Sequence, residues 1–234
     1  MTKLLYCAIG DIHGEFERLK DLHAQVFDHA RLAYSGRPVQ LVHLGDLVDR
    51  GPASAEVIDY LMRLDVPGWP APVTLRGNHE QMMIDAHETG DRRSLDWEQW
   101  ARNGGEATMD SYAFVPPDRL AAHVAWLKTL PTLHVAEAAG LVFVHGGVDP
   151  ALFPDCGEQV HMWTRRPAFF DPARWTAPAL RGKRVIHGHT PTVHSLPEAA
   201  GEGRRLNIDT GAVYGGRLTA AFLEPGAADK FLYA

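Results

Sequence analysis

The sequence predicts one α/β domain spanning residues 1–234. Short apolar segments of strand length alternate, in the first third of the chain, with longer segments whose apolar side chains recur at helical spacing. Five predicted strands end at a glycine beside Asp, Asn or His. Ligands of open α/β sheets bind at the carboxyl ends of strands, so these two patterns together predict an α/β fold with a polar site at one sheet edge.

The elements of the first third are predicted in the order strand, helix, strand, helix, strand. Such units form right-handed parallel crossovers. The predicted strands are Leu4–Ile9, Gln40–Leu44 and Pro72–Arg76, and the predicted helices are Glu15–His29 and Ala53–Leu64. The last third returns to short strands, predicted at Leu141–Val144, Arg184–Ile186, Leu206–Ile208 and Leu218–Leu223.

The middle of the chain, residues 80–130, has no convincing strand pattern and is predicted to be a helical insert over one side of the site. Asp118 is predicted to cap a helix there, and the Pro116–Pro117 pair to end the element before it. The glycines in Asn103–Gly105 predict a turn near the mouth of the cleft, to which the sequence assigns no role.

The composition limits the possible classes of protein. Apolar residues make up 45% and charged residues 22% of the chain, as in a soluble globular protein. The net charge of −6 argues against nucleic acid or an anionic membrane as the main partner. The N-terminal apolar segment fits a core strand better than a signal peptide, and the two cysteines form no disulfide framework. We therefore expect a cytoplasmic protein.

Polar turns with metal-binding chemistry directly follow five of the predicted strands. These turns are Gly10–Gly14, Gly45–Gly51, Gly77–Glu80, His145–Gly147 and His187–Thr190. One such turn would be ordinary, whereas five in order along one chain are difficult to explain without a shared site. Their oxygen and nitrogen donors, without a thiolate, suit Mn, Fe or Zn.

Six of these residues match the needs of a dinuclear centre. Two metal ions ~3.5–4 Å apart require one carboxylate that reaches both ions, with separate ligands on each side. Asp46 lies in the middle of the set and is the natural bridge. The remaining predicted ligands are Asp11 and His13 for one ion, and Asn78, His145 and His189 for the other.

Three neighbouring residues complete a site for phosphoryl chemistry. Two divalent ions lower the pKa of a shared water, which makes hydroxide available near neutral pH. The guanidinium of Arg50 can bind phosphate oxygens through two parallel hydrogen bonds. His79 could protonate a leaving alkoxide, and Asp49 could orient its imidazole.

The stretches GDIHG, GDLVDRG and LRGNHE, followed by His-Gly-Gly and Gly-His-Thr turns, resemble the bacterial and phage-type phosphoprotein phosphatase branch of the calcineurin-like metallophosphoesterases. The resemblance covers residues 4–222 and implies a β-sandwich flanked by helices. It implies the same metal ligands, with His79 and Asp49 as the acid pair. It also implies a second phosphate-binding arginine beside Arg50, for which Arg165 is favoured over Arg166.

The resemblance implies a serine/threonine-type phosphoprotein phosphatase with two divalent ions, Mn being favoured and Fe or Zn the alternatives. Its substrate would be a phosphorylated protein or a small phosphoester, and dual specificity toward phosphotyrosine is compatible with it. The segment 207–216 also resembles symmetrical diadenosine tetraphosphate hydrolases, which gives a second hypothesis. A third hypothesis, a catalytically silent scaffold, is disfavoured because the full set of ligands and catalytic residues is present.

Overall fold

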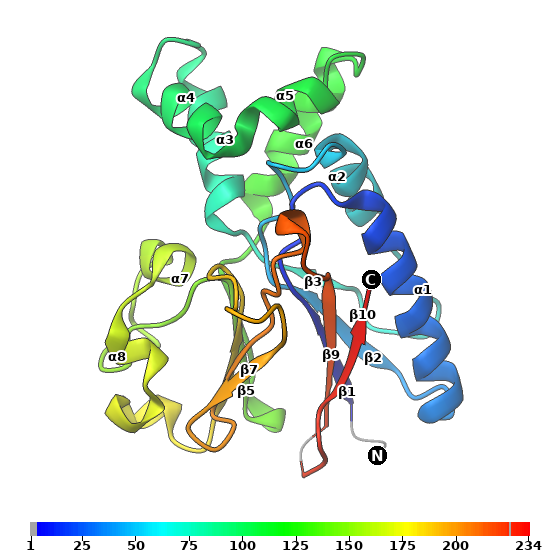
Figure 1. The fold of residues 1–234 in the computed structure, drawn as a ribbon, viewed down its shortest axis with the longest axis vertical. Coiled ribbons are helices and arrows are strands. Elements are labelled where there is room, and N and C mark those ends of the chain that lie inside the picture. The colour runs from blue at the N-terminus through cyan, green and yellow to red at the C-terminus, as the bar shows by residue number, and fades with distance from the viewer. Residues whose placement is uncertain (1–3, 225) are drawn as a thin grey trace.

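The computed structural model describes residues 4–224 and 226–234 and contains two five-stranded mixed sheets (Figure 1). The first sheet has the order β10-β9-β1-β2-β3 and the second the order β4-β5-β6-β8-β7. The strands of the first sheet are β1 (Leu5–Ile9), β2 (Val39–His43), β3 (Val73–Thr74), β9 (Thr219–Leu223) and β10 (Lys230–Tyr233). Those of the second are β4 (Leu133–Ala136), β5 (Leu141–Val144), β6 (Arg184–His187), β7 (Glu198–Ala200) and β8 (Arg205–Asn207).

Helices flank both sheets (Figure 1). Two pack on the first sheet, α1 (Phe16–Ala33) and α2 (Ser54–Arg63). Four form the predicted insert at one end of the molecule, α3 (Asn78–Thr89), α4 (Leu95–Trp100), α5 (Glu106–Ser111) and α6 (Pro117–Thr129). Two short helices lie beside the second sheet, α7 (Glu158–Trp163) and α8 (Pro167–Phe170). None of the helices in the described part of the chain is both long and apolar enough to cross a membrane.

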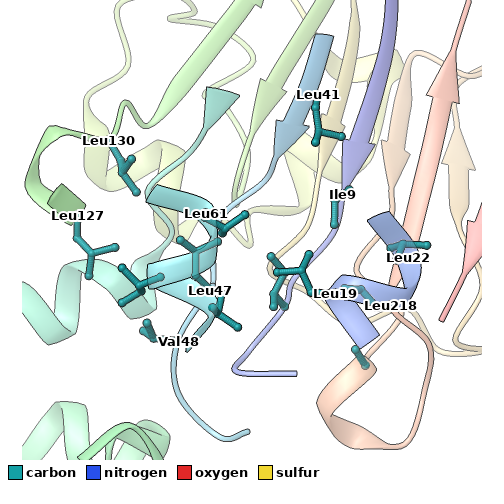
Figure 2. Close-up of a cluster of buried hydrophobic side chains, with 14 of the residues drawn as sticks. Ile9, Leu19, Leu22, Leu41, Leu47, Val48, Leu61, Leu127, Leu130 and Leu218 are labelled. Carbon is teal, nitrogen blue, oxygen red and sulfur yellow. The ribbon is translucent and has the colours of Figure 1, made fainter. Parts of the chain in front are cut away.

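The two faces of β1 serve two cores. Leu5, Cys7 and Ile9 face α1 and α2, whereas Tyr6 and Ala8 face the second sheet. This alternation follows from the two-residue period of a strand. Figure 2 shows the first core, in which leucines of α1, α2 and the strand ends interdigitate. Each fully buried side chain of this size contributes about 1.5–3 kcal/mol to folding.

The predicted α/β class is confirmed, and so is the parallel arrangement of the first three strands. Three strands were not predicted, namely β4, β7 and β10. All three are antiparallel and lie at the edge of their sheet. An edge strand buries little of its surface, so its sequence lacks the continuous apolar run by which a central strand is recognised.

Helix α6 begins slightly earlier than predicted, because Asp118 was expected to be its N-cap residue. Pro116 lies at the N-cap position and Pro117 at the first helical position, so Asp118 is inside the first turn rather than at the cap. Proline suits the first helical position because the backbone N–H it lacks would have no partner there. The proline pair therefore starts a helix.

A chain of polar side chains, all buried except the half-buried Tyr60 of α2, crosses the interface between the helices and the first sheet. His23 contacts the Tyr60 hydroxyl at 2.8 Å through Nδ1 and His43 at 3.1 Å through Nε2. His43 contacts the Thr74 hydroxyl at 3.2 Å. Burial lowers the pKa of His23 to about 4 and holds the pKa of His43 well below its usual range. Both imidazoles are therefore neutral in the folded protein at neutral pH.

Mild acid is expected to destabilise the protein through this pair. In the unfolded chain both histidines titrate near pH 6.5, so between that pH and about pH 4 the unfolded state binds more protons. Stability should therefore fall as the pH drops from 7 to 5. We expect the double variant His23→Gln/His43→Gln to lose less of its urea midpoint over this range than the parent, while exposed His194→Gln behaves as the parent does. An unchanged slope in the double variant would contradict this explanation.

Candidate active site

The predicted site residues come together where the carboxyl ends of the central strands of both sheets meet. Backbone hydrogen bonds join the turns to one another. His13 N–H donates to the Asp46 carbonyl at 2.8 Å, and Gly188 N–H donates to the His145 carbonyl at 2.8 Å. The six predicted metal ligands are all buried, and they come from five separate turns: Asp11, His13, Asp46, Asn78, His145 and His189.

The backbone of the site is held in an unfavourable conformation. Among the described residues, eight non-glycine residues have a positive φ, and five of these belong to the site. These five are His13 (46°), Asp46 (50°), Asp49 (73°), Arg50 (71°) and His189 (69°). Each left-handed residue costs of the order of 1–3 kcal/mol and persists only where the surrounding contacts enforce it. Such a concentration of strain is typical of a functional site.

The carboxylate of Asp46 is the centre of the arrangement. Its Oδ1 lies 3.2 Å from His145 Nε2, and its Oδ2 lies 3.5 Å from His13 Nε2. Burial by itself would raise the pKa of Asp46, but the imidazoles of His145 and His79 more than offset this and hold it well below its usual range. Conversely, burial opposes protonation of His145, yet Asp46 raises its pKa to about 9.

Two of the histidines present Nε2 to this centre because their other nitrogen is engaged. His13 Nδ1 donates to the Val48 carbonyl at 2.8 Å, and His145 Nδ1 donates to the Leu44 carbonyl at 3.0 Å. A backbone carbonyl can only accept, so each contact fixes a proton on Nδ1 and directs Nε2 toward the Asp46 carboxylate. This is the orientation that metal-binding histidines adopt.

Two groups of side chains are close enough to hold a metal ion. His13, Asp46 and His79 form one, and Asp46, His145 and His189 the other; within each group the ligand atoms lie within 4.8 Å of one another. The Asn78 oxygen joins the second group at 3.0 Å from His145 Nε2. Asp11 borders it, since its Oδ2 accepts the His189 N–H at 2.9 Å.

Among the six predicted metal ligands, two buried polar atoms have no hydrogen-bond partner within the described part of the chain. They are Asp11 Oδ1 and His189 Nε2. An unsatisfied polar atom costs about 1–3 kcal/mol unless a further group binds it. Together with the surplus of oxygen and nitrogen donors around Asp46, these atoms fit divalent cations.

The predicted acid pair is in direct contact. His79 Nδ1 lies 2.7 Å from Asp49 Oδ2, and both side chains are almost fully buried. His79 Nε2 is the nitrogen that faces the centre, at 3.9 Å from Asp46 Oδ2. The pair can therefore hold a proton on Nε2 and direct it toward a group bound beside Asp46.

Of the predicted arginines, Arg50 and Arg165 border the site and Arg166 does not. The guanidinium of Arg50 contacts His13 Nε2 and lies 5.5 Å from the ring centre of Tyr214, which is 63% exposed. Arg165 donates to the His189 carbonyl at 3.4 Å. Arg166 instead pairs with Asp149 at 3.1 Å. The geometry thus favours Arg165 for contact with a bound anion.

Glu80 is a site residue whose role the sequence analysis missed. Its carboxylate accepts hydrogen bonds from the backbone N–H groups of Gly77 (2.7 Å), Asp46 (2.8 Å), Leu47 (2.7 Å) and Val48 (3.3 Å). Burial raises the pKa of Glu80 to about 7, while the amides of Gly77 and Leu47 act in the opposite direction. Its place as third residue of α3, where a glutamate satisfies the helix start, was the available signal. Trp100 and Thr108, which contact Asp49, carried no such signal.

Comparison with known proteins agrees with this geometry. The fold and the histidine–carboxylate centre define a hydrolase of the metallophosphoesterase class, whose members use a dinuclear divalent metal site. Residues 5–211 match the calcineurin-like phosphoesterase family, and the chain belongs to it. The sequence resemblance to this family is therefore confirmed, as is the sandwich flanked by helices.

Relatives within the family differ in their substrates. The chain is 30% identical to serine/threonine-protein phosphatase 1 of Salmonella typhimurium, covering 92% of this chain and 90% of that protein. It is 27% identical to the asymmetrical bis(5'-nucleosyl)-tetraphosphatase PrpE of Bacillus thuringiensis, covering 92% and 89%. A Saccharomyces cerevisiae serine/threonine phosphatase has the same fold, with a TM-score of 0.63 at 14% identity over 99% of this chain and 80% of that one.

Replacing Glu80 by Gln should loosen the loop that carries Asp46. The amide group of Gln would face two of the four backbone N–H donors and repel them. We expect the free energy of unfolding to fall by about 2 kcal/mol or more. Glu88→Gln, on the exposed part of the same helix, is the matched control and should change little. Equal stability of the two variants in urea unfolding would contradict the assigned role.

Proposed function

We propose that this metallophosphoesterase is a serine/threonine-type phosphoprotein phosphatase that hydrolyses phosphomonoesters of alcohols. The observation that carries the proposal is the buried His79–Asp49 pair, with Nδ1 and Oδ2 at 2.7 Å, beside the Asp46 centre. An alkoxide is a poor leaving group and needs a proton as it departs, whereas the nucleotide released from a phosphoanhydride is a stable anion. A dedicated acid therefore favours an alcohol ester as substrate.

We assign Asp11, His13 and Asp46 to one divalent ion, and Asp46, Asn78, His145 and His189 to a second. The unpartnered Asp11 Oδ1 and His189 Nε2 support this assignment, as do the Nε2 atoms of His13 and His145, which face the Asp46 carboxylate. Manganese suits the donor set, as do Fe and Zn. When bound, two such ions neutralise phosphate oxygens and make hydroxide available near neutral pH.

The side chains of the protein would supply binding and proton transfer. Arg50 and Arg165 would bind the phosphate oxygens from the open side of the centre. The protonated ring of His79 would donate the proton on Nε2 to the leaving oxygen. The Nδ1–H of the same ring would remain hydrogen-bonded to the Asp49 carboxylate. Because the Asp49 carboxylate is buried against the ring, it would stabilise the imidazolium and hold its orientation.

Hydrolysis of dinucleoside tetraphosphates is the second candidate, because relatives of comparable identity carry that name. Those relatives are the asymmetrical type, whereas the sequence analysis considered the symmetrical one. Both candidates would use the same metal centre and differ in the leaving group. The substrate that we propose is a phosphorylated protein or a small phosphoester. The location that we propose is the cytoplasm, where cysteines are expected to stay reduced, and both cysteines of this chain are free thiols.

Replacing His79 by Asn should separate the acid from the metal centre. We expect turnover of a phosphoserine peptide to fall by about 10²–10⁴-fold, since general acid catalysis is worth that much. Hydrolysis of p-nitrophenyl phosphate should fall far less, because its leaving group needs little protonation. Metal content, measured by elemental analysis, should stay at the parent level. Equal losses on the two substrates would refute the acid role.

Replacing Asp46 by Asn should lower metal content and activity together, because a neutral amide would hold divalent cations far more weakly than a carboxylate. We expect the metal content of the dialysed variant to fall to less than half that of the parent, with turnover of both substrates lost. Asp21→Asn, on the exposed face of α1, is the control and should keep both. Normal metal content with lost turnover would show that Asp46 is not the bridge.

A further inference from the structure

We propose that α4 and α5 of the helical insert orient the acid pair, with Trp100 and Thr108 as its positioning residues. The inference rests on the proposed role of His79. The turn between α4 and α5, residues 101–105, lies against the Asp49–Arg50 segment, although it is remote from that segment in sequence. Nothing in the sequence had given this Asn-Gly-Gly turn a role.

The side chain of Asp49 accepts hydrogen bonds from α4 and α5 of the insert in addition to its contact with His79. Trp100 Nε1 donates to both of its oxygens, at 2.9 Å to Oδ1 and 3.1 Å to Oδ2. The Thr108 hydroxyl donates to Oδ1 at 2.7 Å. All of these groups are buried, and Asp49 has no exposed surface. These bonds leave Oδ2 one direction in which to accept the proton of His79.

The backbone around Asp49 is held by the insert together with Ser54 of α2. The Asp49 N–H lies 2.9 Å from the Thr108 hydroxyl and 3.1 Å from the Ser54 hydroxyl. The next residue, Arg50, donates its N–H to the Gly104 carbonyl at 3.0 Å. Both Asp49 and Arg50 have left-handed backbone angles, which persist only under such constraint. The insert thus supplies most of these contacts, which keep this strained pair in place.

The two glycines of the turn are required for this approach. Gly104 has a φ of 107°, and a Cβ there would lie 2.6 Å from Arg50 Cγ. A Cβ on Gly105 would lie 2.6 Å from the Trp100 ring. Side chains at either position would push the turn away from Arg50 or from the indole. The Gly-Gly pair therefore marks a docking contact between the insert and the site.

The test compares single hydrogen-bond deletions on two substrates. Trp100→Phe and Thr108→Val should each lower kcat for a phosphoserine peptide about tenfold, the rate equivalent of one charge-assisted hydrogen bond. For p-nitrophenyl phosphate the loss should be about twofold or less, because that leaving group needs little protonation. Thr108→Ser keeps the hydroxyl and should restore the parent ratio of the two rates.

Trp97→Phe is the matched control. Trp97 lies on the same helix and packs edge-on against Trp100 at 5.2 Å, but its indole nitrogen has no hydrogen-bond partner in the described part of the chain. It should leave the ratio of the two rates unchanged. If Trp100→Phe and Trp97→Phe lower both rates equally, Trp100 only supports the fold and the inference is overturned.

A second readout is independent of activity and of metal loading. The chain has six tryptophans, whose indole N–H groups give separate ¹⁵N–¹H resonances. The resonance that disappears in Trp100→Phe should shift strongly in Asp49→Asn and in Thr108→Val, and exchange slowly with solvent. A resonance that does not respond to Asp49→Asn would overturn the inference even if the rates change.

The outcomes separate this inference from the proposed function. If His79→Asn loses activity equally on both substrates, the acid role fails and the proposed function with it. If His79→Asn is selective for the phosphoserine peptide but Trp100→Phe and Thr108→Val are not, the function stands and this inference alone fails. If all three share the selectivity, both are supported.

Discussion

The buried carboxylate of Asp46, 2% exposed, sets the constraints that the rest of the site must satisfy. A carboxylate without water is costly unless charges and hydrogen bonds surround it. Here the rings of His13, His79 and His145 converge on its oxygens, and the carboxylate of Glu80 holds its backbone N–H. Strand ends of both sheets and the start of α3 deliver these groups, so the sandwich and the site depend on each other.

The fold divides the work of the site between two parts. Strand ends and the start of α3 supply the groups that converge on Asp46, whereas α4, α5 and the turn between them contact the Asp49–Arg50 segment. The rigid sheets suit a metal centre, which needs ligands at fixed separations. The insert suits an acid, whose proton must point at one atom. This division gives a physical reason for a helical segment of about fifty residues at this end of the sheets.

Sequence reasoning predicted the elements that carry a strong local signal. Central strands such as β1 and β5 were predicted from continuous apolar runs, and the polar turns that follow them were recognised from residue type and order. The edge strand β10 was not predicted, because its residues are only half-buried or exposed and form no continuous buried apolar run. Glu80 binds the backbone N–H of Asp46 from 34 residues away, and its position at the start of α3 signals only its bond to Gly77. Trp100 binds Asp49 from 51 residues away, and no local pattern encodes that contact.

The central claim is that the His79–Asp49 pair serves an alcohol leaving group. It is tested most directly by comparing kcat/KM of the purified protein with Mn²⁺ for a phosphoserine peptide and for diadenosine tetraphosphate. The account predicts that the peptide is preferred and that His79→Asn removes the preference. A higher kcat/KM for the dinucleotide, unaffected by His79→Asn, would contradict the account and assign the protein to the dinucleoside tetraphosphate hydrolases.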